Sequence, residues 1–431
     1  MKIVRADTKG FTKTLAEITG RGEADTTAVE AVVREIVDTV RTDGDAALLS
    51  YATKFDKVTL KRSELRVKRG ELTEALASIP GKDRKILELA AERIRKFHEC
   101  QVDDSWAYED EDGTVLGQMV TPIEKVGIYV PGGKAVYPST VLMNAVPARA
   151  AGVKKIYMVT PAGKRGINRY VLAAAKIAGV DAVFRTGGAQ AVAALAYGTK
   201  IVPKVDKIVG PGNIYVATAK RLVFGTVDID MIAGPSEILV INDGTGKASW
   251  IAADLLAQAE HDELAASVLI TTSRKMAEAV KREVAKQLKK LKRRKIAEAS
   301  IEKYGVIIVV KSLKAAVGIS NEIAPEHLEL FVEEPFELLD SIKNAGAIFL
   351  GPNTPEAVGD YLAGPNHTLP TGGTARFSSP LGVEDFIKRS SLIGFTKKGF
   401  KGLAPSVERF ANLEGLGGHA RSAAIRVPKK K

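Results

Sequence analysis

The sequence predicts an α/β protein built around parallel sheets that are flanked by helices. From residue 121 onward, short β-rich runs alternate with glycine turns and alanine-rich helices, and the same alternation resumes after residue 235. Repeated strand–turn–helix units favour right-handed βαβ crossovers and therefore parallel strands. Hydrophobic residues make up 45% of the 431 residues and charged residues 26%, which is typical of a folded protein.

The elements follow in order along the chain. Amphipathic patterns predict helices over residues 26–42 and 81–100. In the first sheet-forming region we expect four strands, each followed by a helix, at 126–130, 155–159, 182–185 and 207–209. In the second region we expect strands at 237–241, 267–271, 305–310 and 347–350, with helices over 249–260 and 274–298. The last fifty residues are rich in Gly, Ser and Pro, so we expect an extended segment with a short helix or two.

Composition excludes several classes of protein. A single cysteine excludes a disulfide framework, a cysteine-based zinc ribbon and an iron–sulfur cluster. No apolar run reaches the roughly 18 residues of a transmembrane helix, and residues 1–7 lack a secretory core, so a cytoplasmic location is expected. The net charge of +12 favours anionic partners but does not choose among them.

Three glycine turns fall where predicted strands end and helices begin, at Pro131-Gly132-Gly133, Gly187-Gly188 and Gly210-Pro211-Gly212. Glycine lets a backbone approach a phosphate closely, and helix N-termini favour anions. Turn geometry alone also explains glycine at such positions. No dinucleotide fingerprint follows a predicted strand, so any nucleotide site here is of a non-standard kind.

The five histidines can be considered singly. His98 lies on a helix among charged neighbours, which favours a surface or half-buried structural role, and Cys100 beside it is expected to be inert. Gln258 and His261 are three residues apart at the end of a predicted helix, so they share one face and could bind one ion. A histidine that complements the helix dipole is the alternative.

The remaining histidines occur in distinctive surroundings. Pro325 is a plausible first helical residue before Glu326 and His327, and His327 could act as a general base. Asp360 is expected on a helix that begins at Pro355, with His367 in the loop beyond it. His419 follows a glycine-rich run, which suits either close contact with another subunit or a flexible tail.

Taken together, these motifs resemble the histidinol dehydrogenase family. In chain order they are Gly210-Pro-Gly-Asn213, Ile232-Ala-Gly-Pro-Ser236-Glu237, Gln258-Ala-Glu-His261-Asp, Ala-Pro-Glu326-His327-Leu, Gly-Asp360-Tyr with Gly-Pro-Asn-His367, and Leu-Glu414-Gly-Leu-Gly-Gly-His419. The likeness covers almost the whole chain, and jointly the motifs are highly specific. It implies oxidation of L-histidinol to L-histidine through the aldehyde, the last step of histidine biosynthesis, with two NAD and one zinc ion per site.

The resemblance also implies the site residues. Zinc ligands would be Gln258, His261, Asp360 and His419, and the acid–base pair would be Glu326 and His327. Substrate contacts would come from Ser236, Gln258, His261, His327, Asp360, His367, Glu414 and His419. NAD contacts would come from Tyr129, Gln190 and Asn213. His419 and Glu414 would reach the site of a partner subunit, which implies a homodimer. Because Cys100 is far from every motif, a covalent thioester route is disfavoured.

The resemblance and the sequence pattern together predict two Rossmann-like domains with incomplete parallel sheets. We expect an N-terminal helical segment over 1–24, a larger α/β domain over 25–128 and 237–376, an inserted NAD-binding domain over 129–236 and a C-terminal tail over 377–431 that reaches the partner.

Two other classes of function compete. A zinc hydrolase would also use Glu and His beside zinc, but it has no need of the glycine turns. A nucleic-acid-binding protein is suggested by the basic run 286–295 and by Lys429–Lys431. A solvated helix face explains that run better, because aromatic interleaving and RNA-binding motifs are absent. We therefore expect no nucleic-acid partner and no membrane partner.

Overall fold

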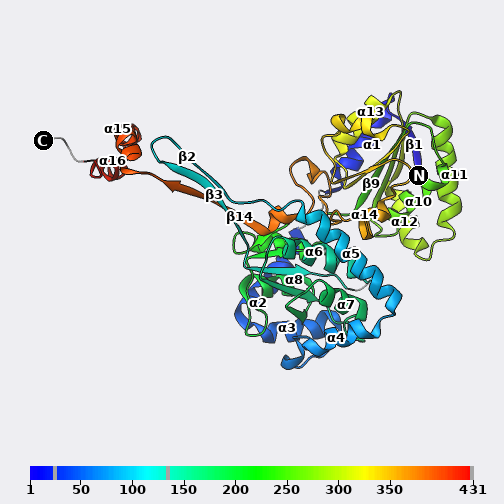
Figure 1. Ribbon diagram of the computed structural model, residues 1–431. Coiled ribbons are helices and arrows are strands. Elements are labelled where there is room, and N and C mark those ends of the chain that lie inside the picture. The colour runs from blue at the N-terminus through cyan, green and yellow to red at the C-terminus, as the bar shows by residue number, and fades with distance from the viewer. Residues whose placement is uncertain (23–26, 133–135, 428–431) are drawn as a thin grey trace. The chain divides into compact units, whose positions relative to one another are not determined.

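The computed structural model describes residues 1–22, 27–132 and 136–427. It divides into two compact units, Met1–Gln101 with Ile123–Phe386, and Val102–Pro122 with Ile387–Lys431 (Figure 1). Thr26, Gly133 and Lys429–Lys431, which entered the predictions above, lie outside the described residues. Within the described part of the chain, no helix combines the length and the apolar character needed to cross a membrane.

The first unit contains a six-stranded parallel sheet in the order β1-β11-β10-β9-β12-β13. Its strands are β1 (Lys2–Arg5), β9 (Glu237–Asn242), β10 (Ala266–Thr271), β11 (Gly305–Val309), β12 (His327–Phe331) and β13 (Ala347–Leu350). The helix expected to begin at Pro325 is wrong, because β12 occupies that place between β9 and β13. Residues 328–332 are all buried, Glu329 included, so the strand is covered on both faces of the sheet, which suits a central parallel strand.

Helices cover both faces of this sheet because its strand residues alternate between two cores. Ile238 and Val240 of β9 pack with one set of helices, and Leu239 and Ile241 pack with the other. The first set is α10 (Ala248–Ala259), α11 (Arg274–Leu288) and α12 (Arg294–Tyr304), and the second is α1 (Lys9–Thr19) and α13 (Leu313–Ile323).

The single helix expected over residues 274–298 is two helices, α11 and α12. The break contains consecutive cationic residues, which repel one another at helical spacing. Within the break, Leu291 packs against the same core as Leu288 at the end of α11. Its partial burial offsets some of the helical hydrogen bonding that the break removes.

The second sheet of this unit has five parallel strands in the order β6-β5-β4-β7-β8. They are β4 (Lys125–Tyr129), β5 (Lys155–Thr160), β6 (Ala182–Arg185), β7 (Lys207–Val209) and β8 (Asp228–Ile229). Together the two helix-flanked parallel sheets confirm the predicted fold class.

Helices from two parts of the chain surround the five-stranded sheet. The crossover helices are α6 (Pro138–Ala150), α7 (Arg169–Ile177), α8 (Gly188–Tyr197) and α9 (Ile214–Val223). The N-terminal helices are α2 (Thr27–Asp43), α3 (Asp45–Tyr51), α4 (Arg69–Ser78) and α5 (Gly81–Glu99). α2 packs against α8 and α9, α4 against α7, and α5 against α6. These helices thus pack with the five-stranded sheet. The sequence analysis instead grouped residues 25–128 with 237–376 in the larger domain. The domain boundaries stay a prediction.

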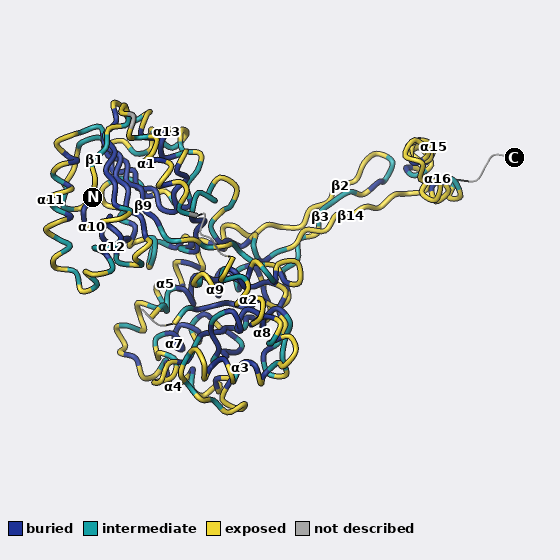
Figure 2. Tube along the Cα trace, turned by 180° about the vertical axis from the view of Figure 1, so that it is seen from behind, coloured by how far each residue is buried: buried dark blue, intermediate teal, exposed yellow. Residues whose placement is uncertain are grey.

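The second unit consists of an antiparallel sheet and two helices. Its strands are β2 (Trp106–Glu109), β3 (Val115–Pro122) and β14 (Ile387–Gly394), in the order β14-β3-β2. α15 (Lys397–Leu413) and α16 (Gly417–Ala424) follow. Figure 2 shows that this unit is exposed over most of its length. Many of its exposed side chains are large and apolar, including Ile393, Phe410 and Leu413, which are 65–71% exposed.

Candidate functional site

Glu326 and His327 lie at the amino-terminal edge of the six-stranded sheet. His327 is the first residue of β12 and pairs in register with Ile238 of β9 on one side and with Ala347 of β13 on the other. Both side chains are buried. Because α10 runs back antiparallel to its strand, its C-terminus with Gln258 reaches the same edge, where Gln258 Nε2 lies 3.3 Å from His327 Nδ1.

The hydrogen bonds of His327 determine which ring nitrogen can act as a base. Nδ1 lies 3.1 Å from the carbonyl oxygen of Glu237, which can only accept, and this shorter contact puts the proton of the neutral ring on Nδ1. The Gln258 N–H at 3.3 Å then cannot donate to that nitrogen. Nε2 then keeps its lone pair. It is buried, has no hydrogen-bond partner among the described residues and lies 3.8 Å from Asp360 Oδ1. Burial lowers the pKa of His327, which keeps the ring neutral.

The carboxylate of Glu326 is anchored beside this ring. Its Oε2 accepts a hydrogen bond of 2.9 Å from the backbone N–H of Glu237 and lies 3.7 Å from His327 Nδ1. The Ser236 side chain also hydrogen-bonds to it. Burial raises the pKa of Glu326 well above its usual value, and the negative charges of Glu237 and Asp360 act in the same direction. A buried carboxyl group of this kind can exchange a proton near neutral pH.

Three further side chains form a group that could hold a metal ion. One ligand atom each from His261, Glu356 and Asp360 lies within 4.8 Å of the other two. His261 is exposed, Glu356 is buried, and Asp360 is intermediate. Oε1 of Gln258 is buried and has no hydrogen-bond partner among the described residues. Oxygen and nitrogen ligand atoms of this kind suit a borderline cation such as zinc.

His367 and Ser236 lie in the same neighbourhood. His367 Nδ1 donates to the backbone carbonyl of Asp360 over 3.0 Å, which orients its ring beside α14 (Glu356–Tyr361). Burial lowers the pKa of His367. The structure therefore brings together seven of the predicted residues, namely Ser236, Gln258, His261, Glu326, His327, Asp360 and His367.

Sequence reasoning missed two groups of residues at this edge. Glu237 fixes both Glu326 and His327 through its backbone, and its own buried side chain pairs with Arg21 at 3.3 Å. Glu356 and Glu329 are both buried as well. Signals for two of these glutamates were present in the sequence, since Glu237 ends the motif that contains Ser236 and Glu356 lies four residues before Asp360. Nothing in the sequence marks Arg21, whose partner is 216 residues away.

Tyr129, Gln190 and Asn213 lie at the carboxyl edge of the five-stranded sheet. Tyr129 ends β4, and its hydroxyl accepts a hydrogen bond of 3.1 Å from the Gly188 N–H, while burial raises its pKa to about 12. Gly188 has φ +64°, and an added Cβ there would meet the Gln190 side chain at 2.7 Å. Asn213 caps α9 by accepting from Tyr215 and Val216.

Glu414 and His419 belong to the second unit. Glu414 is the C-cap of α15, His419 lies in the first turn of α16, and both are exposed. The other predicted site residues lie in the first unit, whereas Glu414 and His419 lie in the second.

His98 corrects an expectation. It is fully buried rather than at the surface, and its Nδ1 hydrogen-bonds to the carbonyl of Ile94 over 2.7 Å. The charged neighbours that suggested exposure lie on the other faces of α5, which composition alone does not distinguish. Cys100 is exposed.

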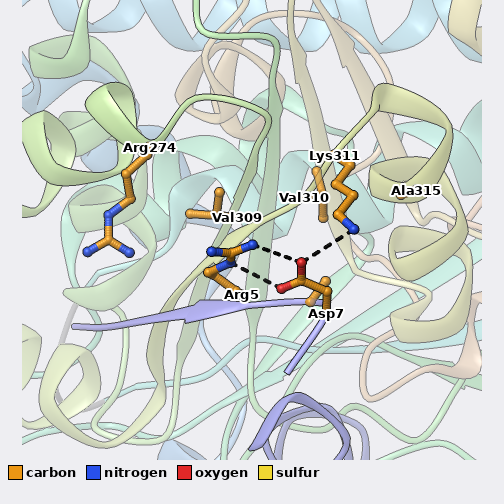
Figure 3. Close-up of a pocket in the computed structure, with 8 residues that line it drawn as sticks. Arg5, Asp7, Arg274, Val309, Val310, Lys311 and Ala315 are labelled. Carbon is orange, nitrogen blue, oxygen red and sulfur yellow. Dashed lines mark hydrogen bonds and ion pairs between the residues drawn. The ribbon is translucent and has the colours of Figure 1, made fainter. Parts of the chain in front are cut away.

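A second hollow lies at the opposite, carboxyl edge of the six-stranded sheet (Figure 3). It has a volume of about 500 Å³ and is lined by Arg5, Arg274 and Lys311 together with Asp7. The Asp7 carboxylate forms ion pairs with Arg5 at 2.8 Å and with Lys311 at 3.5 Å. Arg274 forms an ion pair with Glu278 at 2.8 Å. Each cation therefore already has an acidic partner, and this hollow is a weaker candidate site than the buried cluster.

Comparisons with known proteins agree on one family. The sequence model described as histidinol dehydrogenase matches residues 19–427. A histidinol dehydrogenase of Syntrophotalea carbinolica is 57% identical over 427 residues, 99% of either chain, and one of Aquifex aeolicus is 56% identical over 94% of either chain. The crystal structure of histidinol dehydrogenase from Elizabethkingia anophelis is 36% identical, with a TM-score of 0.92 over 99% of this chain and 97% of that one.

Proposed function

The chain belongs to the histidinol dehydrogenase family, and we propose on that premise that it oxidises L-histidinol to L-histidine through the aldehyde, the last step of histidine biosynthesis. As a member of this family it is an oxidoreductase, which sets the hydrolase alternative aside. NAD and zinc are the proposed cofactors, and the cytoplasm is the proposed location.

The observation that carries the proposal is the buried base. His327 is neutral, its Nδ1–H is fixed by the Glu237 carbonyl, and its Nε2 lone pair faces Asp360. A substrate hydroxyl beside Nε2 would lose its proton to this nitrogen as the neighbouring carbon is oxidised. Since Glu237 holds the ring by backbone and Arg21 holds Glu237 in turn, the base is pre-oriented.

The second oxidation needs a water molecule to add to the aldehyde carbon. Glu326 is suited to accept a proton from that water, because burial raises its pKa and so strengthens the carboxylate as a base. Ser236 and the Glu237 N–H hold the carboxylate in place. Once His327 has released the alcohol proton to solvent, its Nε2 would accept the proton of the hydrated aldehyde in the second oxidation.

The donor set fits the metal. Gln258, His261 and Asp360 would hold it, with His419 from a partner subunit, and His367 would contact substrate beside Asp360. When bound, a divalent cation polarises the substrate oxygen and lowers its pKa. The buried and unpartnered Oε1 of Gln258 supports this assignment.

The carboxyl edge of the five-stranded sheet fits NAD, which when bound accepts a hydride in each oxidation. α8 has no side-chain cap and no acidic residue in its first turn, so its N-terminal N–H groups suit an anion. The Thr186 hydroxyl just before it is buried without a hydrogen-bond partner among the described residues. Tyr129, Gln190 and Asn213 are the proposed contacts.

A homodimer would complete the site with Glu414 and His419 of the partner. Two observations support it. Both side chains are exposed in the second unit, and that unit carries many large apolar side chains on its surface, among them Ile393, Phe410 and Leu413. Packing against a second copy would remove these side chains from water, which stabilises an interface.

The direct test is the absorbance of reduced nicotinamide when zinc-loaded protein is mixed with L-histidinol and NAD. We expect two reduced nicotinamides per L-histidine formed, because conversion of an alcohol to a carboxylate removes four electrons. If zinc-loaded, folded protein produces none, the proposal fails.

A further inference from the structure

We propose that Lys220 and Asp230 are positioning residues, which hold the turn Gly210-Pro211-Gly212 in the conformation that receives NAD. The inference rests on the proposed use of NAD and adds to it, because neither residue is among the expected cofactor contacts. Lys220 lies on α9, and Asp230 directly follows β8. Both would act on the cofactor through the backbone of the turn.

The pair holds both polar groups of the Gly210 backbone. Asp230 Oδ2 accepts a hydrogen bond of 2.7 Å from the Gly210 N–H, and Lys220 Nζ donates one of 3.1 Å to the Gly210 carbonyl oxygen. The two side chains also form an ion pair with each other. The second carboxylate oxygen of Asp230 accepts from the Met231 N–H over 2.6 Å. Because hydrogen bonds to charged groups are about twice as strong as neutral ones, this network fixes the peptide groups on both sides of Gly210.

The burial of the pair indicates a role beyond stability. The Lys220 side chain is 3% exposed and the Asp230 side chain is 1% exposed. Removing two charges from water costs free energy that offsets their attraction, so well-packed apolar side chains often stabilise a fold equally well. Apolar side chains cannot, however, direct a donor and an acceptor at one particular glycine. The pair therefore specifies the conformation of the turn.

The position of the turn explains why its conformation matters. Gly210 has φ +112°, and an added Cβ there would collide with the carbonyl oxygen of Tyr129 at the end of β4. Asn213 follows three residues later as the N-cap of α9. Glycine loses more conformational freedom on folding than any other residue, so such a turn needs restraint from outside. A displaced turn would change the alignment of Tyr129 and Asn213, which are two of the proposed NAD contacts.

A purely structural role for the pair is the alternative. The double variant Lys220→Met/Asp230→Asn distinguishes the two roles, because it removes both charges and keeps similar side-chain volumes, while the Gly210 carbonyl loses its donor. A positioning role predicts that the dissociation constant for NAD rises about fivefold or more, as expected for the loss of one hydrogen bond. It also predicts faster amide exchange at the turn with little change in thermal unfolding. A purely structural role predicts a lower unfolding temperature and unchanged affinity for NAD.

Calorimetric titration of the full-length protein with NAD would measure the dissociation constant. Hydrogen–deuterium exchange would report on the turn, and circular dichroism on unfolding. The matched control is Lys207→Met/Asp385→Asn, which removes another ion pair of a buried lysine, of 3.2 Å, at the start of β7. Lys207 forms its ion pairs with Asp385 and Asp228. We expect the affinity of this control for NAD to stay close to that of wild type.

The outcomes separate the inference from the proposed function. Unchanged affinity for NAD in the double variant, or an equal loss in the control, overturns the inference. Lys220→Met alone keeps the hydrogen bonds of Asp230 to Gly210 and Met231, and the same criteria apply to it if the double variant does not fold. Failure of the wild type itself to bind NAD would instead refute the proposed use of NAD, and the inference with it.

Discussion

The two parallel sheets of the first unit place their candidate residues at opposite edges. In the six-stranded sheet, Glu237 and His327 begin their strands, so the buried titratable side chains lie at the amino-terminal edge. In the five-stranded sheet, Tyr129 ends its strand, and the glycine turns follow at the carboxyl edge. The carboxyl edge is the usual ligand position of open α/β sheets, so the six-stranded sheet departs from the rule.

The direction of the peptide dipoles explains what each edge can bind. α10 brings its carbonyl end to the amino-terminal edge and has no basic residue in its last turn, which favours a cation there. α8 brings its N–H end to the carboxyl edge and has no acidic residue in its first turn, which favours an anion. Under the proposed function, one architecture would therefore hold a metal ion at one sheet edge and a nucleotide at the opposite edge of the other sheet.

The largest effect is expected at the amino-terminal edge. His327→Asn keeps an N–H that can reach the Glu237 carbonyl but removes the basic nitrogen. Loss of a general base costs about 10²- to 10⁴-fold in kcat, and we expect that loss with little change in KM for NAD. Steady-state kinetics would measure both. His367→Asn is the control, for which we expect mainly a higher KM for L-histidinol; an equal fall in kcat there would contradict a special role for His327.

The next effect tests whether the amino-terminal edge is complete within one subunit. His327→Asn and His419→Asn homodimers should each be nearly inactive. After unfolding and refolding as an equal mixture, half of the dimers are mixed, and one of their two sites regains both histidines. We therefore expect activity of about one quarter of wild type. Absence of recovery, although mixed dimers are demonstrated by differential tagging, would place His419 in its own subunit's site or outside any site.

Much of this comparison could be predicted from the sequence. Periodicity located most of the crossover strands and helices of both sheets, because β-rich runs and glycine turns are local signals, but it missed α13 and the short strand β8. The strand β12 was missed, since Pro325 before Glu326 and His327 suggested a helix start. Strand character there comes from pairing with β9 and β13, which lie far away in the chain. β1 was likewise missed, because its four residues are stabilised by pairing with β11.

Only those residues of the candidate site that belong to recognisable motifs could be predicted from the sequence. His327, Asp360 and His367 stand in recognisable patterns, and the structure places them within contact of one another. The role of Glu237 depends on its backbone N–H and carbonyl, which carry no sequence signal. The burial of Glu356 follows from the packing of α14 against α10 and is equally invisible in the sequence.

A smaller effect is expected at the carboxyl edge of the five-stranded sheet. Gly188→Ala forces a side chain onto a residue with φ +64° and pushes against Gln190. Such strain costs about 1–2 kcal/mol, equivalent to roughly a 5- to 30-fold rise in KM for NAD if the turn holds the cofactor. KM for L-histidinol should hardly change. Gly318→Ala is the control, because nothing lies within 4 Å of the added carbon. Equal changes in both Michaelis constants would contradict separate edges.

The smallest effect concerns the stability cost of the acidic amino-terminal edge. Asp254 of α10 hydrogen-bonds to Glu329, and burial raises its pKa from 3.8 to about 6. Between these values the folded protein holds a proton that the unfolded chain has released, so the contribution of Asp254 to stability falls as pH rises from about 4 to 6 and is level above that. Asp254→Asn cannot ionise, and its amide oxygen can still accept a hydrogen bond from Glu329. The variant should therefore gain stability over wild type across this window.

The size of this gain follows from the shift. A shift of this size corresponds to about 3 kcal/mol, but the side chain keeps some contact with solvent and shares its proton with Glu329, so we expect about 1 kcal/mol at pH 7. Urea unfolding of metal-free protein between pH 4.5 and 7.5 would measure it, with Asp38→Asn on the exposed face of α2 as the control. A difference that does not grow with pH, or a variant less stable than wild type at pH 7, would show that the acidic cluster is not under strain without its cation. In that case the acidic side chains at the amino-terminal edge would not destabilise the metal-free fold. The argument that this edge favours a cation, while the carboxyl edge of the five-stranded sheet favours an anion, would then lose its energetic support.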